Sequence, residues 1–197
     1  MSRLPNIQPK DFSEAQQKVF ENIIGGKRGQ GSDLATYLNA EGGLRGPFNA
    51  YLFNPTVGDA AQQLGAALRF EGNLPSTLRE VAILTVGAKW QAQYEWWAHE
   101  KIALEVGVDP RLIAGIKAGV LPDTATPDEV TVHSLAQELI NHHHVSDEQY
   151  KEAVDLLGES NVVELVILLG YYTLISMTLN TFKIPIPEGE ELPFQQK

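Results

Sequence analysis

Helix start and stop signals recur along this sequence and limit its possible folds more than any other feature. Thr126-Pro127-Asp128-Glu129 and Ser146-Asp147-Glu148-Gln149 each set a hydroxyl three residues before a Glu or Gln, the pattern of a capping box. Asn54-Pro55 sets a capping amide before a proline at the first helical position. Gly107 and Gly158 each follow a helical stretch, where glycine commonly ends a helix. No segment sustains an alternation of polar and apolar residues, so the sequence predicts an all-α fold of about eight helices.

These signals divide the chain into helical segments and one irregular stretch. The helices are expected at about 12–24, 34–39, 54–70, 77–89, 92–106, 110–119, 126–141, 147–158 and 162–181, with an ordered irregular loop at 42–54. A chain of 197 residues, 43% of them hydrophobic, suffices for one domain with its own core and is short for two. We therefore predict a single domain with an N-terminal extension over about 1–42, a core over about 43–182 and an extended tail over 183–197.

The net charge of the chain limits the kinds of molecule that it is expected to bind. Fifteen Lys and Arg stand against 25 Asp and Glu, which gives a net charge of −10. An acidic surface repels phosphate backbones and anionic headgroups. The sequence therefore predicts no nucleic-acid partner and no membrane partner.

The sequence contains no cysteine, which excludes disulfides, thiolate nucleophiles and cysteine-bound metals. This composition fits a cytoplasmic location, and the segment Met1 to Lys10 lacks the apolar run of a signal peptide. The longest apolar run, Val162 to Leu179, includes Glu164 and several hydroxyl side chains, whereas a membrane span carries fewer polar groups. We expect it to form a buried core or interface helix.

An acid and an imidazole share the apolar side of one predicted helix. Glu95 and His99 are four residues apart, so their side chains can meet. On a helical wheel they point the same way as Ile102 and Val106. Charged and imidazole groups on a core-facing stripe indicate either a structural polar network or an acid–base site.

A second acid strengthens the acid–base interpretation. Glu80 lies within a helix whose apolar residues surround its axis, and a buried carboxylate is costly unless it is paired or protonated. His99, Tyr94 or a nearby arginine are its expected partners. Two acids, one histidine and one tyrosine within twenty residues favour a proton-transfer site, and a structural network that ties helices together is the alternative.

Other candidate residues have more ambiguous patterns. All three tryptophans lie within eight residues, so Trp96 could line a site for a flat ligand or simply pack in a core. Arg45, in the expected loop, could hold a substrate carboxylate through its guanidinium or lie in solvent. The run His142-His143-His144 is no chelate on a helix, because consecutive side chains point about 100° apart. No metal site is expected.

Several motifs resemble the carboxymuconolactone decarboxylase family and the related alkylhydroperoxidase AhpD branch. They are Arg79-Glu80-Val81-Ala82-Ile83-Leu84, Tyr94-Glu95-Trp96-Trp97-Ala98-His99, Leu44-Arg45-Gly46-Pro47-Phe48-Asn49, Asn54-Pro55 and Gly170-Tyr171-Tyr172. The resemblance covers roughly Gly43 to Phe182 and implies an AhpD-like helical bundle. It also draws attention to Phe48 and Asn49, beside Arg45, as substrate-binding candidates.

The same resemblance shows one clear departure. The peroxidase branch carries a glutamate, then Cys-x-x-Cys, then a histidine four residues on. Glu80 and His99 match the glutamate and histidine, whereas the cysteine positions correspond to Ala92 and Glu95. Disulfide chemistry needs thiols, so we expect no thiol peroxidase activity.

The decarboxylase branch, which the sequence resembles better in this respect, implies a cofactor-free enzyme that forms ring-like homo-oligomers. We therefore predict a lyase or isomerase that acts on a small organic acid or lactone in a homo-oligomer, a trimer or hexamer. His99 would donate or shuttle the proton, Glu95 would orient it, Glu80 would be a second acid–base group, and Tyr94 would stabilise an oxyanion. The alternative is a non-catalytic, oligomeric ligand-binding or scaffold protein of the same fold.

Overall fold

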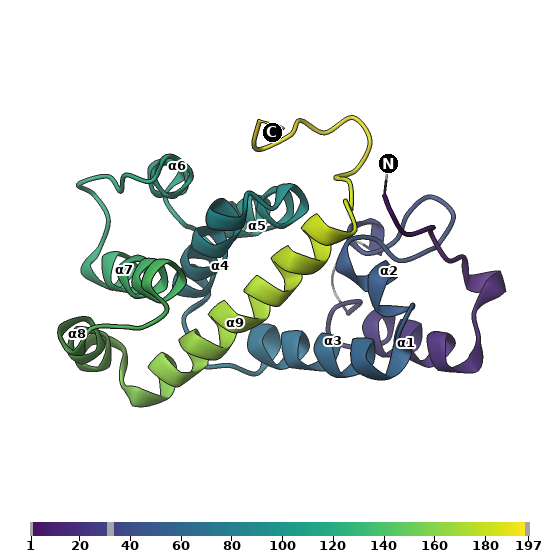
Figure 1. The fold of residues 1–197 in the computed structure, drawn as a ribbon, viewed down its shortest axis with the longest axis horizontal. Helices are drawn as coiled ribbons and strands as arrows, with labels where there is room; N and C mark the ends of the chain where they lie inside the picture. The colour runs from purple at the N-terminus through teal and green to yellow at the C-terminus, as the bar shows by residue number, and fades with distance from the viewer. Residues whose placement is uncertain (1, 31–33, 196–197) are drawn as a thin grey trace. The chain divides into compact units, whose positions relative to one another are not determined.

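The computed structural model describes residues 2–30 and 34–195. These residues form nine α-helices and two short 3₁₀-helices, and no β-strand occurs among them (Figure 1). The α-helices are α1 (Glu14–Ile24), α2 (Pro47–Tyr51), α3 (Pro55–Phe70), α4 (Ser76–Trp90), α5 (Gln93–Glu105), α6 (Pro110–Ala118), α7 (Pro127–His142), α8 (Asp147–Leu157) and α9 (Glu159–Thr181). The 3₁₀-helices span Pro9–Asp11 and Leu34–Thr36. The all-α prediction is confirmed.

Most helix ends coincide with the signals in the sequence. The Thr126 hydroxyl accepts a hydrogen bond from the Glu129 backbone amide, and the Glu129 carboxylate accepts one from the Thr126 backbone amide. The predicted capping box is therefore present. Gly107 and Gly158 end α5 and α8 with φ angles of 95° and 80°, a conformation that glycine adopts without a Cβ clash. At Ser146 only the hydroxyl half of the box forms, because the serine amide instead binds the Glu138 carboxylate.

The expectation of an irregular loop throughout 42–54 is wrong, because α2 lies inside it. Gly46 has a φ of 60°, which turns the chain into a helix whose first residue is Pro47. Proline needs no amide partner at that position and already holds a helical φ. The five residues of α2 are too few to show a helical period in the sequence.

Two compact units make up the chain. The first comprises the residues up to Gly72 together with Thr178–Pro187, and the second comprises Asn73–Met177 together with the residues from Glu188. In the first unit, α1 and α2 both pack against α3. Val19, Ile23, Leu44 and Leu52 form a buried core there. The prediction of a single domain with boundaries near 42 and 182 stays a prediction.

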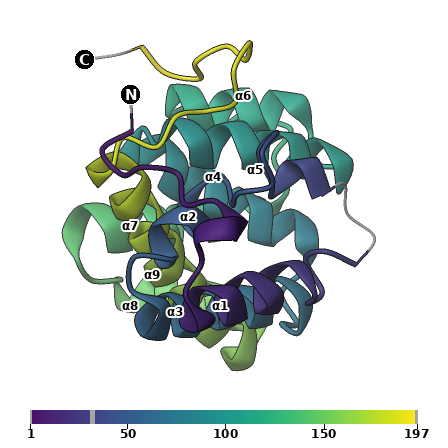
Figure 2. The same cartoon turned by 90° about the vertical axis from the view of Figure 1, so that its right-hand side faces the viewer.

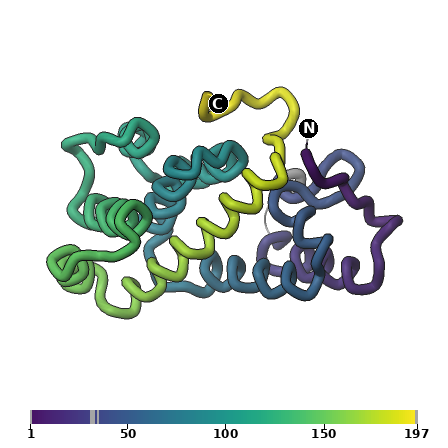
Figure 3. The backbone as a smooth tube through the Cα atoms, viewed as in Figure 1, coloured from purple at the N-terminus to yellow at the C-terminus, as the bar shows by residue number. Residues whose placement is uncertain are grey.

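Helix α4 is the centre of the second unit. It packs against α5, α6 and α7, and α8 packs against α7 (Figures 1 and 2). Every residue of α4 from Glu80 to Gly87 is buried, which agrees with the apolar residues seen all round its axis in the sequence. The tube in Figure 3 follows the chain from α7 through α8 into α9. The Glu164 carboxylate of α9 accepts the backbone amides of Asn73 and Leu74, just before α4 begins, at 2.7 and 3.2 Å.

Helix α9 is long and apolar enough to cross a membrane by length and composition, but half of its most apolar window is buried within the protein. Its buried residues include Leu165, Leu168 and Leu169, which recur at helical spacing. A packed helix with one core face explains this composition. The polar residues within this run predicted a core or interface helix, and its buried face agrees with that prediction.

Candidate functional site

Two consecutive helices of the second unit bring three ionisable side chains together. Glu80 lies in α4, and Glu95 and His99 lie one turn apart in α5. A short turn joins these helices at Gln91, whose φ of 47° lets the chain reverse within two residues. The exposed fractions of the three residues are 1%, 4% and 7% for Glu80, Glu95 and His99. The sequence predicted this convergence, and the structure has it.

The imidazole of His99 lies between two carboxylates. Its Nδ1 is 2.6 Å from Oε2 of Glu80, and its Nε2 is 3.4 Å from Oε1 of Glu95. The other Glu80 oxygen, Oε1, is 3.8 Å from Nε of Arg79. The guanidinium of Arg79 therefore lies near Glu80, and the imidazole of His99 lies between Glu80 and Glu95. These groups are buried, and charge interactions are stronger there than in bulk water.

The two contacts assign different roles to the ring nitrogens. An ionised carboxylate only accepts hydrogen bonds, so when Glu80 is ionised the 2.6 Å contact is donated by Nδ1 of His99. The Nε2 atom then carries the lone pair of the neutral ring, or a second proton when the ring is charged. The proton that can be exchanged is thus on the side of His99 that faces Glu95.

Glu95 stands in the first turn of α5, where the helix dipole favours a negative charge. The N-cap residue is Ala92, whose side chain makes no capping bond. Glu95 therefore places its carboxyl group at this helix end, beside the imidazole of His99.

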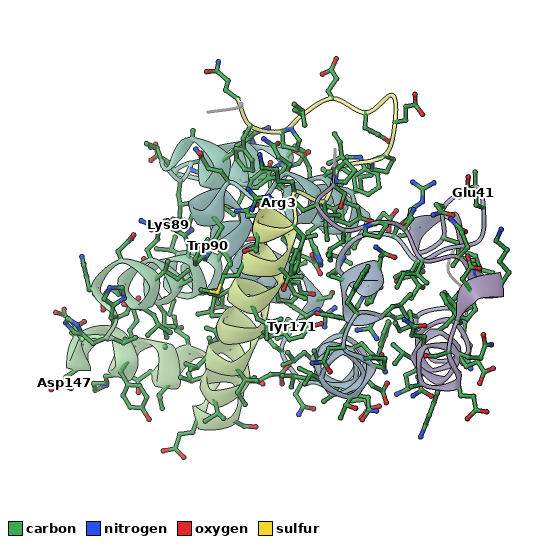
Figure 4. The ribbon with its side chains drawn as sticks, turned by 45° about the vertical axis from the view of Figure 1, so that its right-hand side comes forward. Arg3, Glu41, Lys89, Trp90, Asp147 and Tyr171 are labelled. Carbon is green, nitrogen blue, oxygen red and sulfur yellow. The ribbon has the colours of Figure 1, made fainter. Side chains whose placement is uncertain are left out.

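A third helix contributes an aromatic residue to which the sequence analysis gave no role. The ring of Tyr172 on α9 meets the His99 ring nearly edge-on, with centroids 5.0 Å apart and planes at 85°. Tyr171, labelled in Figure 4, packs against Tyr172 in the same way at 5.3 Å. Polar aromatics inside a long apolar run were the only signal for this contact, and sequence gives no pairing between α9 and α5.

Tyr94 and Trp96 flank Glu95 on α5 but point in other directions, because neighbouring helical residues lie about 100° apart. Tyr94 is buried and packs on Trp97 with centroids 5.4 Å apart. Trp96 is fully buried and meets the ring of Phe194 at 5.4 Å. Their predicted roles as oxyanion donor and ligand-lining residue remain predictions.

The three predicted substrate-binding residues of the 42–54 segment lie in the other compact unit. Arg45 Nε donates to the Leu38 carbonyl at 2.5 Å. Phe48 packs edge-on with Tyr37 and Tyr51 at 5.9 and 6.1 Å.

Asn49 is held by the N-terminal segment of the same unit. It donates from Nδ2 to the Pro5 carbonyl and accepts from the Ile7 amide, both at 3.1 Å. These contacts give Arg45, Phe48 and Asn49 structural partners within the first unit. Their role toward a substrate is untested.

A second buried histidine of the same unit offers a comparison with His99. His133 on α7 is 8% exposed, and its Nδ1 lies 2.9 Å from the Thr85 hydroxyl. That hydroxyl donates to the Val81 carbonyl at 2.7 Å, so His133 must be the donor in its own bond to Thr85. Burial lowers the pKa of His133 below its ordinary value of 6.5. His133 is thus held neutral beside a hydroxyl, whereas His99 faces two acids.

Comparison with known proteins supports the family resemblance. Residues 55–138 match the model of the carboxymuconolactone decarboxylase family. That segment contains α3 to α6, most of α7, and the whole Glu80–Glu95–His99 group. A search of curated protein sequences gave no match.

Solved structures share the fold across nearly the whole chain. An uncharacterised peroxidase-related protein with an alkylhydroperoxidase AhpD core from Ralstonia eutropha JMP134 aligns with a TM-score of 0.73 and 15% identity, covering 95% of this chain and 93% of its own. A peroxidase-related protein from Silicibacter sp. TM1040 aligns at 0.69 and 16%, covering 93% and 91%.

The debrominase Bmp8, solved as a cysteine-to-alanine variant in complex with 2,3,4-tribromopyrrole, aligns with a TM-score of 0.72 and 14% identity over 95% of each chain. At these identities the likeness establishes the fold alone. Residues 55–138 are thus similar to the carboxymuconolactone decarboxylase family, and the chain has the fold of AhpD-like proteins without their Cys-x-x-Cys pair.

Proposed function

We propose that this protein is a cofactor-free acid–base enzyme, a decarboxylase-like lyase or an isomerase, acting on a small organic acid or lactone. The observation that carries the proposal is the buried His99 imidazole between the carboxylates of Glu80 and Glu95. Acid–base catalysis needs a group that gains and loses a proton near neutral pH, and histidine does this more readily than any other side chain.

In a decarboxylation the bond between the carboxylate carbon and its neighbour breaks, carbon dioxide leaves, and the electron pair stays on the substrate as an enolate. Protonated His99 then delivers its Nε2 proton to the substrate carbon and takes a new proton from water. In an isomerisation neutral His99 first removes a proton and later returns it to another atom. Neither route requires an oxidant or a thiol.

The geometry favours exchanging the roles that the sequence suggested for the two acids. Glu80 makes the shorter contact, at 2.6 Å to Nδ1, so it is suited to orient His99 and to stabilise the imidazolium. Glu95 lies at 3.4 Å from Nε2, on the side where the proton moves. We assign Glu80 as the positioning residue and Glu95 as the second acid–base group.

The test uses proton exchange, which does not depend on knowing the final product. The protein is incubated in heavy water with a panel of γ-lactones, butenolide carboxylates and 2-oxo acids, and proton NMR follows deuterium uptake and loss of the carboxylate. We expect uptake or decarboxylation of at least one panel class, abolished in His99→Gln and retained in His133→Gln. Exchange that persists in His99→Gln would overturn the proposal.

A non-catalytic ligand-binding or scaffold protein is the second candidate, and the burial of the site favours it. The three residues are at most 7% exposed, as expected for a polar network that ties α4 to α5. Under this alternative none of the panel compounds exchanges a proton, and the same compounds raise the melting temperature equally in the parent and in His99→Gln.

The cellular location, the assembly and the partners of the protein are also part of this proposal. We propose a cytoplasmic homo-oligomer, a trimer or hexamer, with neither nucleic acid nor membrane as partner. The net charge of −10 supports the exclusion of polyanionic partners. Size-exclusion chromatography with light scattering tests the assembly, and a monomer near 21.7 kDa at micromolar concentration would contradict it.

A further inference from the structure

Arg79 is a nearly buried cation beside the Glu80 carboxyl group, and the proposed proton transfer gives it no role. Its side chain is 13% exposed, and its Nε lies 3.8 Å from Oε1 of Glu80. That distance is too long for a hydrogen bond, so the contact is an interaction between charges. The Nε atom is buried and makes no hydrogen bond to any residue that the structure describes. Within the same residues, Glu80 is also the only acid with which Arg79 forms an ion pair.

The two oxygens of Glu80 have different neighbours. Oε2 lies 2.6 Å from Nδ1 of His99 on α5, and Oε1 faces Arg79 on α4. Because Glu80 is only 1% exposed, solvent screens these interactions weakly. An arginine side chain keeps its charge at every pH that a folded protein tolerates. Arg79 therefore presents a permanent positive charge to the acid that contacts His99.

The proton in the 2.6 Å contact can belong to either partner. On Nδ1 of His99 it is donated to an ionised Glu80, and Nε2 is then the nitrogen that exchanges protons, on the side of Glu95. On Oε2 of Glu80 it is donated to a bare Nδ1, and the neutral ring keeps its proton on Nε2. In this second arrangement the only basic nitrogen of His99 already accepts a bond from Glu80. Proton transfer at Nε2 therefore requires the first arrangement.

Two features of the site favour the second arrangement. Burial favours the protonated form of a carboxyl group, and every residue of α4 from Glu80 to Gly87 is buried. Glu95 adds a second acid, 3.4 Å from the other nitrogen of the same ring, and two ionised carboxyl groups close together repel each other. A fixed positive charge beside Glu80 opposes both effects, and Arg79 supplies it.

We propose that Arg79 is a positioning residue, whose charge stabilises the ionised form of Glu80 and thereby keeps the shared proton on Nδ1 of His99. An opposite charge at about 4–6 Å changes the ratio of ionised to protonated carboxyl by roughly 10- to 1000-fold. Arg79 thus determines which nitrogen of His99 exchanges protons, without touching the ring itself. Its effect on catalysis rests on the proposed acid–base function, whereas its effect on the proton of His99 does not.

Nitrogen NMR shows directly which ring nitrogen of a histidine carries a proton, and it needs no substrate. Spectra of the isotope-labelled whole chain correlate each ring nitrogen with the ring C–H protons, and the His99 signals are those lost in His99→Gln. Arg79→Met removes the charge and keeps a long unbranched side chain, whereas Arg79→Lys keeps the charge. Arg111→Met, at an exposed arginine of α6, is the control variant. The internal reference is His133, whose Nδ1 donates to the Thr85 hydroxyl.

The parent protein should show a protonated Nδ1 in His99. In Arg79→Met the ratio of bare to protonated Nδ1 should rise by about tenfold or more, the low end of the effect of one neighbouring charge. Arg79→Lys should restore most of the parent's ratio, and neither Arg111→Met nor the His133 signals should change. A bare Nδ1 in the parent, or an unchanged ratio in a folded Arg79→Met, would overturn the proposal. Failure of Arg79→Lys to restore the ratio would overturn it too, because packing and not charge would then be responsible.

A second set of variants tests whether Arg79 acts through Glu80. Glu80→Gln carries no charge, and its amide can donate to Nδ1, so His99 should show a bare Nδ1 whether or not Arg79 is present. The double variant of Arg79→Met with Glu80→Gln should therefore match Glu80→Gln alone, and a further change in the His99 signals would contradict the proposed route. If Arg79→Met does not fold, Arg79→Gln, which also lacks the charge but keeps a polar end, takes its place with the same expected results.

The deuterium-exchange assay separates this proposal from the proposed function. If a panel compound exchanges, Arg79→Met should slow the exchange and Arg79→Lys should restore it, while Arg111→Met should leave it unchanged. Unimpaired exchange in an Arg79→Met protein whose His99 has a bare Nδ1 would refute the positioning role. If no panel compound exchanges, the proposed function fails, and the NMR spectra of the parent and the variants still decide whether Arg79 sets the proton of His99.

Discussion

Replacing His99 by glutamine separates a proton-transfer role from a purely structural one. Glutamine is similar in length and can donate one hydrogen bond to Glu80, but it cannot exchange a proton near neutral pH. Its amide leaves one of the two acids, at 2.6 and 3.4 Å from the imidazole, without its present partner. An unsatisfied buried group costs about 1–3 kcal/mol, so the free energy of unfolding should fall by this amount.

The effect on turnover should be larger. General acid–base groups contribute about 10²–10⁴-fold, which corresponds to a barrier increase of about 2.7–5.4 kcal/mol at 1.36 kcal/mol per decade. A stability loss of about 1–3 kcal/mol lowers the melting temperature by roughly 2–12 °C in a chain of this size. Most of the variant should therefore stay folded at 25 °C while turnover nearly disappears.

His133→Gln is the matched control, since His133 is buried to the same degree and also makes one side-chain hydrogen bond. Calorimetry and the deuterium-exchange assay are run on the same preparations of the parent and both variants. Both should lose stability, and only His99→Gln should lose exchange. Equal fractional losses of activity in the two variants, or a folded His99→Gln with full activity, would remove His99 from the mechanism.

Three further predictions follow from separate features. Burial lowers the pKa of His133, so below about pH 6.5 the unfolded chain binds more protons than the folded chain. The free energy of unfolding should therefore fall as the pH decreases through that range, and it should fall less in His133→Gln. Urea titrations at several pH values measure this free energy. Gln93→Ala removes two hydrogen bonds to the Phe194 backbone, at 2.8 and 2.9 Å, so a protease should cleave the C-terminal tail about 5–100-fold faster, as mass spectrometry would record. Lacking cysteine, the protein should consume no peroxide with a dithiol reductant beyond a heat-killed control, and turnover above that control would contradict this expectation.

The helix boundaries could be predicted where the signal is local. At Thr126 and at Asn54 a capping side chain accepts from the backbone amide three residues away, and at Gly158 the positive φ requires only the glycine itself. Ser13 and Gln16 form another complete capping box, whose signal is local in the sequence but was not among the predicted helix starts. Ser146 forms only half of its box because the carboxylate of Glu138, on α7, accepts the hydrogen bond from its amide.

The site could be predicted in part for the same reason. Glu95 and His99 are neighbours on one helix, so their spacing alone placed them together. Glu80 was identified because an acid is costly within an all-round apolar helix, although its 2.6 Å bond to His99 depends on how α4 meets α5. The contact with Tyr172 is set entirely by the packing of α9, which no spacing in the sequence encodes.

Glu95 bears on the proposed acid–base function, because it stands where the peroxidase branch that the sequence resembles carries a thiol. In the resemblance to the peroxidase branch, Ala92 and Glu95 occupy the cysteine positions, and here these are the N-cap and the first turn of α5. The positive end of a helix favours a thiolate and a carboxylate for the same reason. Glu95 thus places a carboxyl group 3.4 Å from the imidazole of His99, in a chain without cysteine. A carboxyl group exchanges protons and not electrons, which supports the proposed proton transfer over redox chemistry at this group.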